Sequence, residues 1–169
     1  MNSKESKNTS HTIVEISSSS ENEFLHDGID HHSDYQNFQT NRKNVTTIRS
    51  STKKEILLFQ EQERERFNNP TKAYQYIYRS RKIWVGPAVK KVSNWGAKPR
   101  KHALLSPHRP YFVTILCLVR DAVARLPNAK GTRMDVCRLL SESQFIDRGF
   151  GVDKLSMVVS RAMDRLHYE

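Results

Sequence analysis

Apolar positions recur most regularly in the last third of the chain, where three stripes are separated by short polar loops. The last stripe has the three- and four-residue spacing of one helix face and comprises Leu155, Val158, Val159, Ala162, Met163 and Leu166. The first stripe has the same spacing and comprises Val113, Leu116, Val119, Val123 and Leu126. Between them, Val136 and Leu140 mark the inner face of a shorter helix, and Phe145 anchors the following loop. The pattern predicts three helices packed around these side chains.

Residues at the ends of the stripes indicate where the helices begin. Pro110 suits the first turn of the first helix, where its missing N–H is not needed. Thr132, followed by Asp135, predicts the cap of the second helix, and Asp153 predicts that of the third. Three short helices with a glycine-containing turn before the second are typical of a helix-turn-helix core. Such a core commonly continues into a β-hairpin wing, and the sequence stops where that wing would begin.

Residues 52–109 hold one further predicted helix and an extended segment. Thr52 and Glu55 match a capping box, and good helix formers continue to Arg66, with their charges expected on a solvated face. Alternate tyrosines then show the period of a strand: Tyr74, Tyr76 and Tyr78. A Gly-Pro pair at 86–87 interrupts any regular element. Prolines and cations after it predict an extended basic arm, here defined as residues 88–109.

Residues 1–51 show no sustained apolar period and are rich in Ser, Asn, Thr and His. Such a segment buries too little surface to offset its ordering entropy, so we expect disorder. The chain therefore divides into a disordered polar tail (1–51), a helix plus basic arm (52–109) and a winged-helix-like domain (110–169). The predicted fold class is all-α, a tri-helical helix-turn-helix or winged-helix-like core with the wing largely missing.

The net charge of +10 is concentrated in the middle of the chain. Residues 51–110 carry fourteen basic and four acidic residues, whereas the two flanking segments are nearly balanced. No acidic residue occurs between Glu65 and Asp121. Such a stretch attracts acidic partners. The cations of the arm that we expect to make these contacts are Lys90, Lys91, Lys98, Arg100, Lys101 and Arg109.

Two kinds of acidic partner fit the arm. Its cations would neutralise DNA phosphates and release counterions, with Trp84 and Trp95 stacking on exposed bases. Alternatively, the two tryptophans anchor the arm on the helical core, and the cations dock on an acidic protein subunit. Charge alone carries no base readout, so the sequence favours protein docking, with DNA as the alternative.

The third predicted helix stands where helix-turn-helix proteins place their recognition helix. Its outer cations are Lys154, Arg161 and Arg165, with Asp153 and Asp164 on the same helix. No cluster of Asn, Gln or Arg stands at its start to read base edges. A solvated or protein-facing surface is therefore favoured here too.

Several function classes have no support in the sequence. No run of about 18 apolar residues is present to span a membrane, and the N-terminus shows no secretory signal. The motifs of phosphate-binding loops, serine hydrolases and zinc proteases are absent, so we expect neither an enzyme nor a cofactor. Cys117 and Cys137 are expected as buried free thiols. The His and Asp residues within 26–34 are not expected to form a metal site, because such sites need closed, well-spaced ligand sets.

Eight blocks of the sequence resemble a known family. They are FQEQER (59–64), VGP (85–87), RPYFVTIL (109–116), LVRDA (118–122), ARLPN (124–128), GTR (131–133), SQF (143–145) and DRLHYE (164–169). Together they look like the winged-helix region of the nuclear factor related to kappa-B-binding protein family. The resemblance covers about residues 52–169.

Members of that family are metazoan subunits of the Ino-eighty type chromatin-remodelling complex. The resemblance therefore implies nuclear, non-enzymatic work in chromatin and transcription regulation and in DNA repair, with other subunits as partners. Family members are far longer, carry an upstream deubiquitinase-adaptor domain, and continue past the DRLHYE block into strands. We therefore expect a truncated form. A fragment without independent function is a further alternative.

Overall fold

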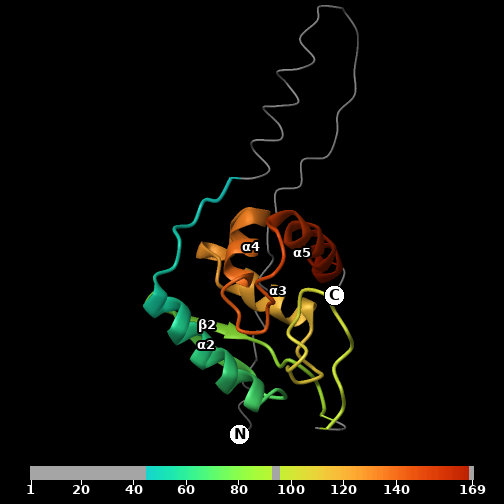
Figure 1. Ribbon diagram of the computed structural model, residues 1–169. Helices are drawn as coiled ribbons and strands as arrows, with labels where there is room; N and C mark the ends of the chain where they lie inside the picture. The colour runs from blue at the N-terminus through green and yellow to red at the C-terminus, as the bar shows by residue number, and fades with distance from the viewer. Residues whose placement is uncertain (1–44, 93–95, 168–169) are drawn as a thin grey trace, which may run out of the picture.

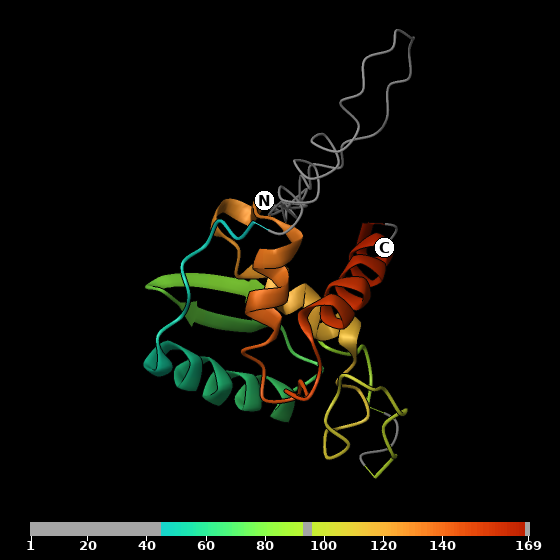
Figure 2. The same cartoon turned by 45° about the horizontal axis from the view of Figure 1, so that its top comes forward.

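The computed structural model describes residues 45–92 and 96–167. Its elements are α2 (Lys53–Asn68), β1 (Tyr74–Tyr78), β2 (Arg81–Val85), α3 (Ile115–Ala124), the 3-10 turn η1 (Pro127–Ala129), α4 (Arg133–Leu140) and α5 (Val152–His167). Helices α3, α4 and α5 gather on one side, and α2 and the hairpin lie along the other (Figure 1). The second half of the basic arm loops out beside α3 (Figure 2).

Side-chain caps explain where two of the helices begin. The Thr52 hydroxyl accepts a hydrogen bond from the Glu55 amide, and the Glu55 carboxylate accepts one from the Thr52 amide. Thr132 and Asp135 form the same box at the start of α4. Each box satisfies amides that a helix start leaves unpaired. The sequence-based predictions for both helix starts are confirmed.

The starts of α3 and α5 differ from the predictions. Helix α3 begins at Ile115 and is capped by the Thr114 hydroxyl, so the placement of Pro110 in its first turn was wrong. Asp153 lies inside the first turn of α5 rather than at its cap, where its carboxylate complements the helix dipole. No helix of the described residues is long and apolar enough to cross a membrane.

The core lies between the three C-terminal helices. Of the residues predicted there, eight are buried: Val113, Val119, Val123, Leu126, Val136, Leu140, Val159 and Ala162. The other six are half-buried: Leu116, Phe145, Leu155, Val158, Met163 and Leu166. Side chains from elsewhere complete the same core, namely Ile48, Phe67, Tyr78, Leu105 and Phe112. The domain is therefore larger than the three helices alone.

The prediction of an all-α fold was wrong, because β1 and β2 pair as an antiparallel two-stranded sheet. The fold is mixed α and β, and the hairpin precedes the three helices along the chain. Arg79 and Ser80 form the turn with φ of 50° and 62°, the left-handed pair that a tight hairpin turn requires. Because neither residue is glycine or asparagine, the usual hairpin signal is missing. The tyrosine alternation identified only the first strand.

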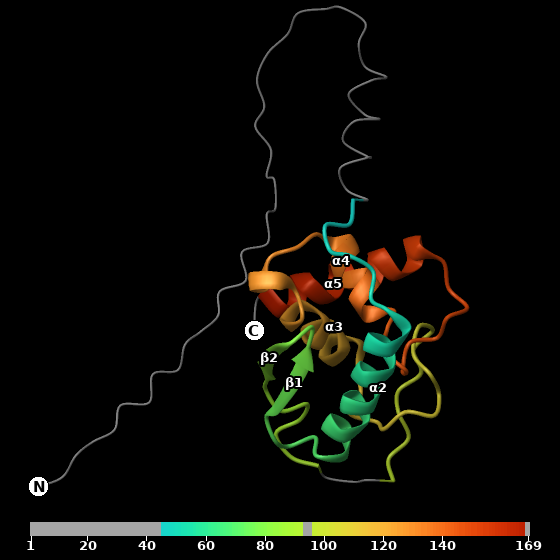
Figure 3. The same cartoon turned by 90° about the vertical axis from the view of Figure 1, so that its left-hand side faces the viewer.

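Helix α2 and the hairpin form one layer, in which α2 lies beside β1 and β2 lies on the far side (Figure 3). The Phe59 and Tyr76 rings pack with centroids 5.6 Å apart. Glu63 and Arg66 on the same helix face are also buried. The expectation that the α2 charges are all solvated was therefore wrong for these two side chains.

Residues 45–49 run along the start of α4 as a strap. Asp135 accepts hydrogen bonds from the Thr47 amide at 2.7 Å, the Thr47 hydroxyl at 2.6 Å and the Ile48 amide at 3.1 Å. The Thr132 hydroxyl donates to the carbonyl of Val45 at 2.8 Å. The strap lies within the predicted polar tail, so the folded part begins before residue 52. The rest of the tail, including the His and Asp residues of 26–34, lies outside the described residues.

Candidate interaction surface

The basic arm is fixed to the fold at several points. At its start, the Pro70 carbonyl accepts the amides of Ala88 and Val89 at 2.8 and 3.1 Å. Further on, Leu104 and Leu105 are buried, and Leu105 forms an isolated antiparallel bridge with Ile146. The arm therefore presents its cations from an anchored backbone, although part of it is irregular in structure.

Arg109 is buried and bonded within the arm, unlike the other predicted cations. Its guanidinium donates to the carbonyls of Val113 at 2.9 Å, Ser106 at 2.7 Å and Arg100 at 2.5 Å. Burial lowers the pKa of Arg109 from its ordinary value. A guanidinium with three carbonyl acceptors stabilises the arm, so Arg109 is a structural residue of the arm and not one of its surface cations.

The other predicted cations of the arm are all exposed: Lys90, Lys91, Lys98, Arg100 and Lys101. Trp84 lies on β2 with 67% of its surface exposed, so it does not anchor the arm on the core. Trp95 lies outside the described residues. The arm thus offers five accessible cations and no acidic side chain.

The predicted cations of the third helix form one line along α5. Lys154, Arg161 and Arg165 are exposed and follow one another at seven and four residues, which places them on one helix face. Asp153 and Asp164 are also exposed on this helix. A row of three cations suits phosphates, but two nearby carboxylates weaken that field.

Two large apolar side chains of α5 are exposed on different faces: Met157 on the face of the three cations, and Val152 among the residues that line a groove. Val152 and Met157 of α5 are each 58% exposed. Between α4, the following loop and α5 runs an open groove of about 450 Å³, with Met134, Phe150 and Leu155 among its lining residues. Exposed apolar groups that cluster with a groove are typical of protein-binding surfaces.

A buried ion pair holds α2 and the hairpin against α3. Arg66 donates through Nε to Asp121 Oδ2 at 2.6 Å and through Nη2 to Oδ1 at 3.0 Å. The Tyr76 hydroxyl donates to the same carboxylate at 3.1 Å. The bidentate geometry and the third donor satisfy the carboxylate in a place that water does not reach.

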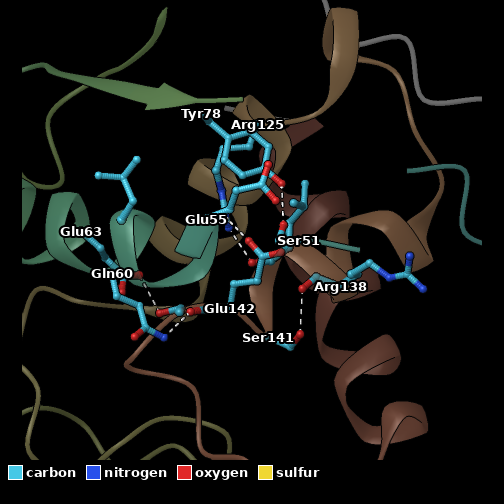
Figure 4. Close-up of polar contacts among 12 residues, drawn as sticks. Ser51, Glu55, Gln60, Glu63, Tyr78, Arg125, Arg138, Ser141 and Glu142 are labelled. Carbon is cyan, nitrogen blue, oxygen red and sulfur yellow. Dashed lines mark hydrogen bonds and ion pairs between the residues drawn. The ribbon is translucent and has the colours of Figure 1, made fainter. Parts of the chain in front are cut away.

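A second buried network joins α2 to the loop after α4. Glu63 accepts hydrogen bonds from the Ser143 hydroxyl at 2.6 Å and the Gln144 amide at 3.1 Å. Burial raises the pKa of Glu63 to about 6, and these donors oppose that rise. Next to it, Arg125 pairs with Glu142 at 2.8 Å. The Gln60 side chain of α2 donates to the Glu142 carbonyl at 2.8 Å (Figure 4).

Sequence reasoning missed both networks, although a signal was present. Phe59, Glu63, Arg66 and Phe67 follow the spacing of a single helix face and are all buried. Two phenylalanines on that face mark it as inward, so the charges between them needed buried partners. Two of the blocks that carry the family resemblance meet here, because residues 59–64 contact residues 143–145.

The two cysteines are buried and free, as predicted. Burial raises the pKa of each thiol to about 11. Thiols in this environment stay protonated at neutral pH and are poor nucleophiles.

Comparison with known proteins identifies the family to which this sequence belongs. The family described as the NFRKB second winged helix domain matches residues 55–169, a range that includes α2, the hairpin and the three helices. The chain belongs to this family. A protein of Xenopus tropicalis, the nuclear factor related to kappa-B-binding protein, is 47% identical over 125 residues. These cover 72% of this chain but 10% of the relative, so the chain spans about a tenth of that protein's length. No solved structure matches the chain significantly.

Membership of the NFRKB second winged-helix family confirms the resemblance inferred from the eight blocks. The family match runs from the first turn of α2 to the end of the chain. Helix α2 and the hairpin, which the prediction separated from the winged-helix-like core, therefore lie within the matched range.

Proposed function

We propose that the chain is a non-enzymatic protein-binding module of a nuclear chromatin-remodelling complex of the Ino-eighty type. Its relative is named as a nuclear factor, and the family resemblance implies that complex. The observation that carries the proposal is the exposure of two apolar side chains on α5, Met157 beside the cations and Val152 at the groove. Apolar side chains gain free energy by burial against a protein surface and gain little from phosphate. Other subunits of the complex are the proposed partners.

The test is recovery of identified remodeller subunits from nuclear extract with the tagged full chain. Met157→Glu should lower their recovery about tenfold, because it places a charge where an apolar contact forms. Asn68→Glu, at the exposed end of α2, is the matched control and should leave recovery unchanged. Recovery of no remodeller subunit, or equal recovery with Met157→Glu, would contradict the proposal.

The second proposed function is binding of DNA phosphates. It is favoured by the line of Lys154, Arg161 and Arg165 and by the five exposed cations of the arm. Fluorescence anisotropy with a random duplex should then show binding that weakens steeply between about 50 and 200 mM salt. Absence of binding at low salt would exclude this function.

Both functions require the chain to fold as it stands. Circular dichroism should show a cooperative loss of helical signal on heating, as expected for a packed domain of this size. A gradual change without a transition would instead support the alternative of a fragment without independent function.

A further inference from the structure

Exposed apolar side chains concentrate on one face of the molecule away from α5. The described residues include seven large hydrophobic side chains that are exposed. Three of them lie where α2 borders the hairpin, namely Leu58, Ile77 and Trp84, whereas Leu57 is turned about 100° away from Leu58 on the helix. A monomeric protein gains nothing from such a cluster, which is typical of a docking surface. We call Leu58, Ile77, Lys82 and Trp84 the hairpin face.

The strand register explains how the hairpin face is assembled. Ile77 stands opposite Lys82, and Gln75 stands opposite Trp84, so these side chains point to the same side of the sheet. Tyr76 and Val85 point to the other side and are buried. Ile77 is 53% exposed and Trp84 is 67% exposed, which leaves the outer side open.

One outer edge of the hairpin is already covered. The Ile77 amide donates to the Gln62 side-chain oxygen at 2.6 Å, and the Gln62 nitrogen donates to the Ile77 carbonyl at 3.1 Å. The same nitrogen lies 3.2 Å from the carbonyl of Leu58, so this turn of α2 borders Ile77. Helix α2 therefore occupies the edge of β1 (Figure 3).

The edge of β2 has no such cover within the described part of the chain. The two-residue turn makes Tyr78 and Arg81 a hydrogen-bonded pair, so the backbone groups of Lys82 and Trp84 point away from β1. No described residue bonds to these groups. An open strand edge is a template for another strand.

The positive charge around the open edge of β2 favours an acidic segment as its binding partner. Lys82 stands on the hairpin face beside the open edge and is exposed. Strand β2 carries Arg81 and Lys82, and neither strand carries an acidic residue, so carboxylates approaching this edge meet a positive charge. A basic segment or a second copy of the same edge would be repelled.

We propose that an acidic, extended segment of a partner protein adds as a third strand along β2. Its apolar side chains pack on Ile77 and Trp84, and a carboxylate pairs with Lys82. Main-chain hydrogen bonds to Lys82 and Trp84 set the position of the segment, and the alternate side chains give specificity. The inference rests on the proposed function of the chain as a protein-binding module.

The probe is an eight-residue peptide of two Val-Thr-Glu-Thr repeats with blocked ends, which presents Val and Glu alternately on one side. Titration of the full chain should slow amide exchange at Lys82 and Trp84 at least about tenfold, as strand pairing protects amides. Replacing each Glu of the peptide by Lys should abolish binding. N-methylation removes the backbone N–H donors. Methylating the alternate residues whose N–H groups face β2 should abolish binding, whereas methylating the residues in between should not, because their N–H groups point away from β2.

Trp84→Ala should weaken peptide binding about tenfold, and Met157→Ala on α5 is the matched control that should not. Trp84 is exposed, so its loss leaves the fold intact, and an unchanged thermal melt verifies this. Equal binding of the Lys peptide, indifference to both N-methylations, or protection of Lys82 and Trp84 by self-association alone would each overturn the inference. Recovery of remodeller subunits by a chain that binds no peptide would refute the strand addition and leave the proposed function standing.

Discussion

Arg66 is fully buried, and its guanidinium forms an ion pair with the carboxylate of Asp121. Arg125 is nearly as buried, and it pairs with Glu142 while its guanidinium lies 3.6 Å from the centre of the Phe59 ring. A buried charge is tolerated only with such partners. At the scale of single residues, these pairs determine how α2 and the hairpin sit on the helices.

Asp121→Asn tests the first of these pairs. The amide keeps the shape of the carboxylate but removes its charge, which leaves the Arg66 guanidinium buried without compensation. The free energy of unfolding should fall by about 3–5 kcal/mol, measured by urea denaturation. Arg64→Met at an exposed position of α2 is the control and should change it by no more than about 0.5 kcal/mol. A loss below about 1 kcal/mol for Asp121→Asn would show that the pair does not hold α2.

Glu63 should make stability depend on pH in an unusual direction. Its pKa is raised to about 6 in the folded protein, so the folded state binds its proton more tightly than the unfolded state does. The stabilisation from the protonated form is complete below the ordinary carboxylate pKa and is lost as pH rises through about 6. Glu63→Gln removes this dependence.

The difference in unfolding free energy between Glu63→Gln and wild type should therefore move by about 2 kcal/mol in favour of the variant between pH 4.5 and 7.5. Subtracting the two curves cancels groups that both proteins share, such as His102. Glu61→Gln at an exposed position should give a flat difference. If the difference in unfolding free energy between Glu63→Gln and wild type did not change with pH, the pKa of the Glu63 carboxyl would not be raised in the folded protein.

At the scale of elements, the helices were predictable because their signals are local. Thr52 with Glu55 and Thr132 with Asp135 each identify a helix start within four residues. The hairpin was not predictable in the same way, because its turn uses residues that rarely adopt left-handed angles. Only the pairing of β1 with β2, favoured by burial of Tyr76, overrides that preference.

Ser80→Gly should stabilise the hairpin. Ser80 has a φ of 62°, which crowds the Cβ of an L-residue and which glycine adopts freely. After allowance for the greater freedom of glycine in the unfolded chain, a gain of about 0.5–1 kcal/mol is expected in urea denaturation. Lys82→Gly in the strand is the matched control and should destabilise by about 0.5–1 kcal/mol. Destabilisation by Ser80→Gly would contradict the left-handed turn.

At the scale of the whole molecule, what the sequence could not reveal is the set of contacts between distant segments. The link from Thr47 to Asp135 and the bridge from Leu105 to Ile146 join parts that were assigned to a tail, an arm and a core. Within the candidate interaction surface too, some features were predictable from the sequence and others depend on contacts between distant segments. The exposure of the lysines followed from composition, whereas the burial of Arg109 depends on carbonyls that only the folded arm brings together.

Asp135→Asn should separate the strap from the rest of the molecule. The carboxylate accepts four hydrogen bonds, from the amide and hydroxyl of Thr47 and the amides of Ile48 and Thr132. These donors lower its pKa. An amide group offers only one acceptor atom, so unfolding free energy should fall by about 2–3 kcal/mol. Because a lowered pKa stabilises the fold above the ordinary carboxylate range, the loss should be largest at neutral pH and vanish on acidification.

Amide exchange distinguishes release of the strap from general weakening. Thr47 and Ile48 should exchange faster in Asp135→Asn by more than the global loss of stability accounts for, because their acceptor is removed directly. Amides in the middle of α3 should follow the global change alone. Asp147→Asn is the matched control, because this exposed carboxylate accepts, among the described residues, the nearby Gly149 amide alone. If Thr47 and Ile48 kept their protection in Asp135→Asn, the strap would be held by the burial of Ile48 rather than by the carboxylate.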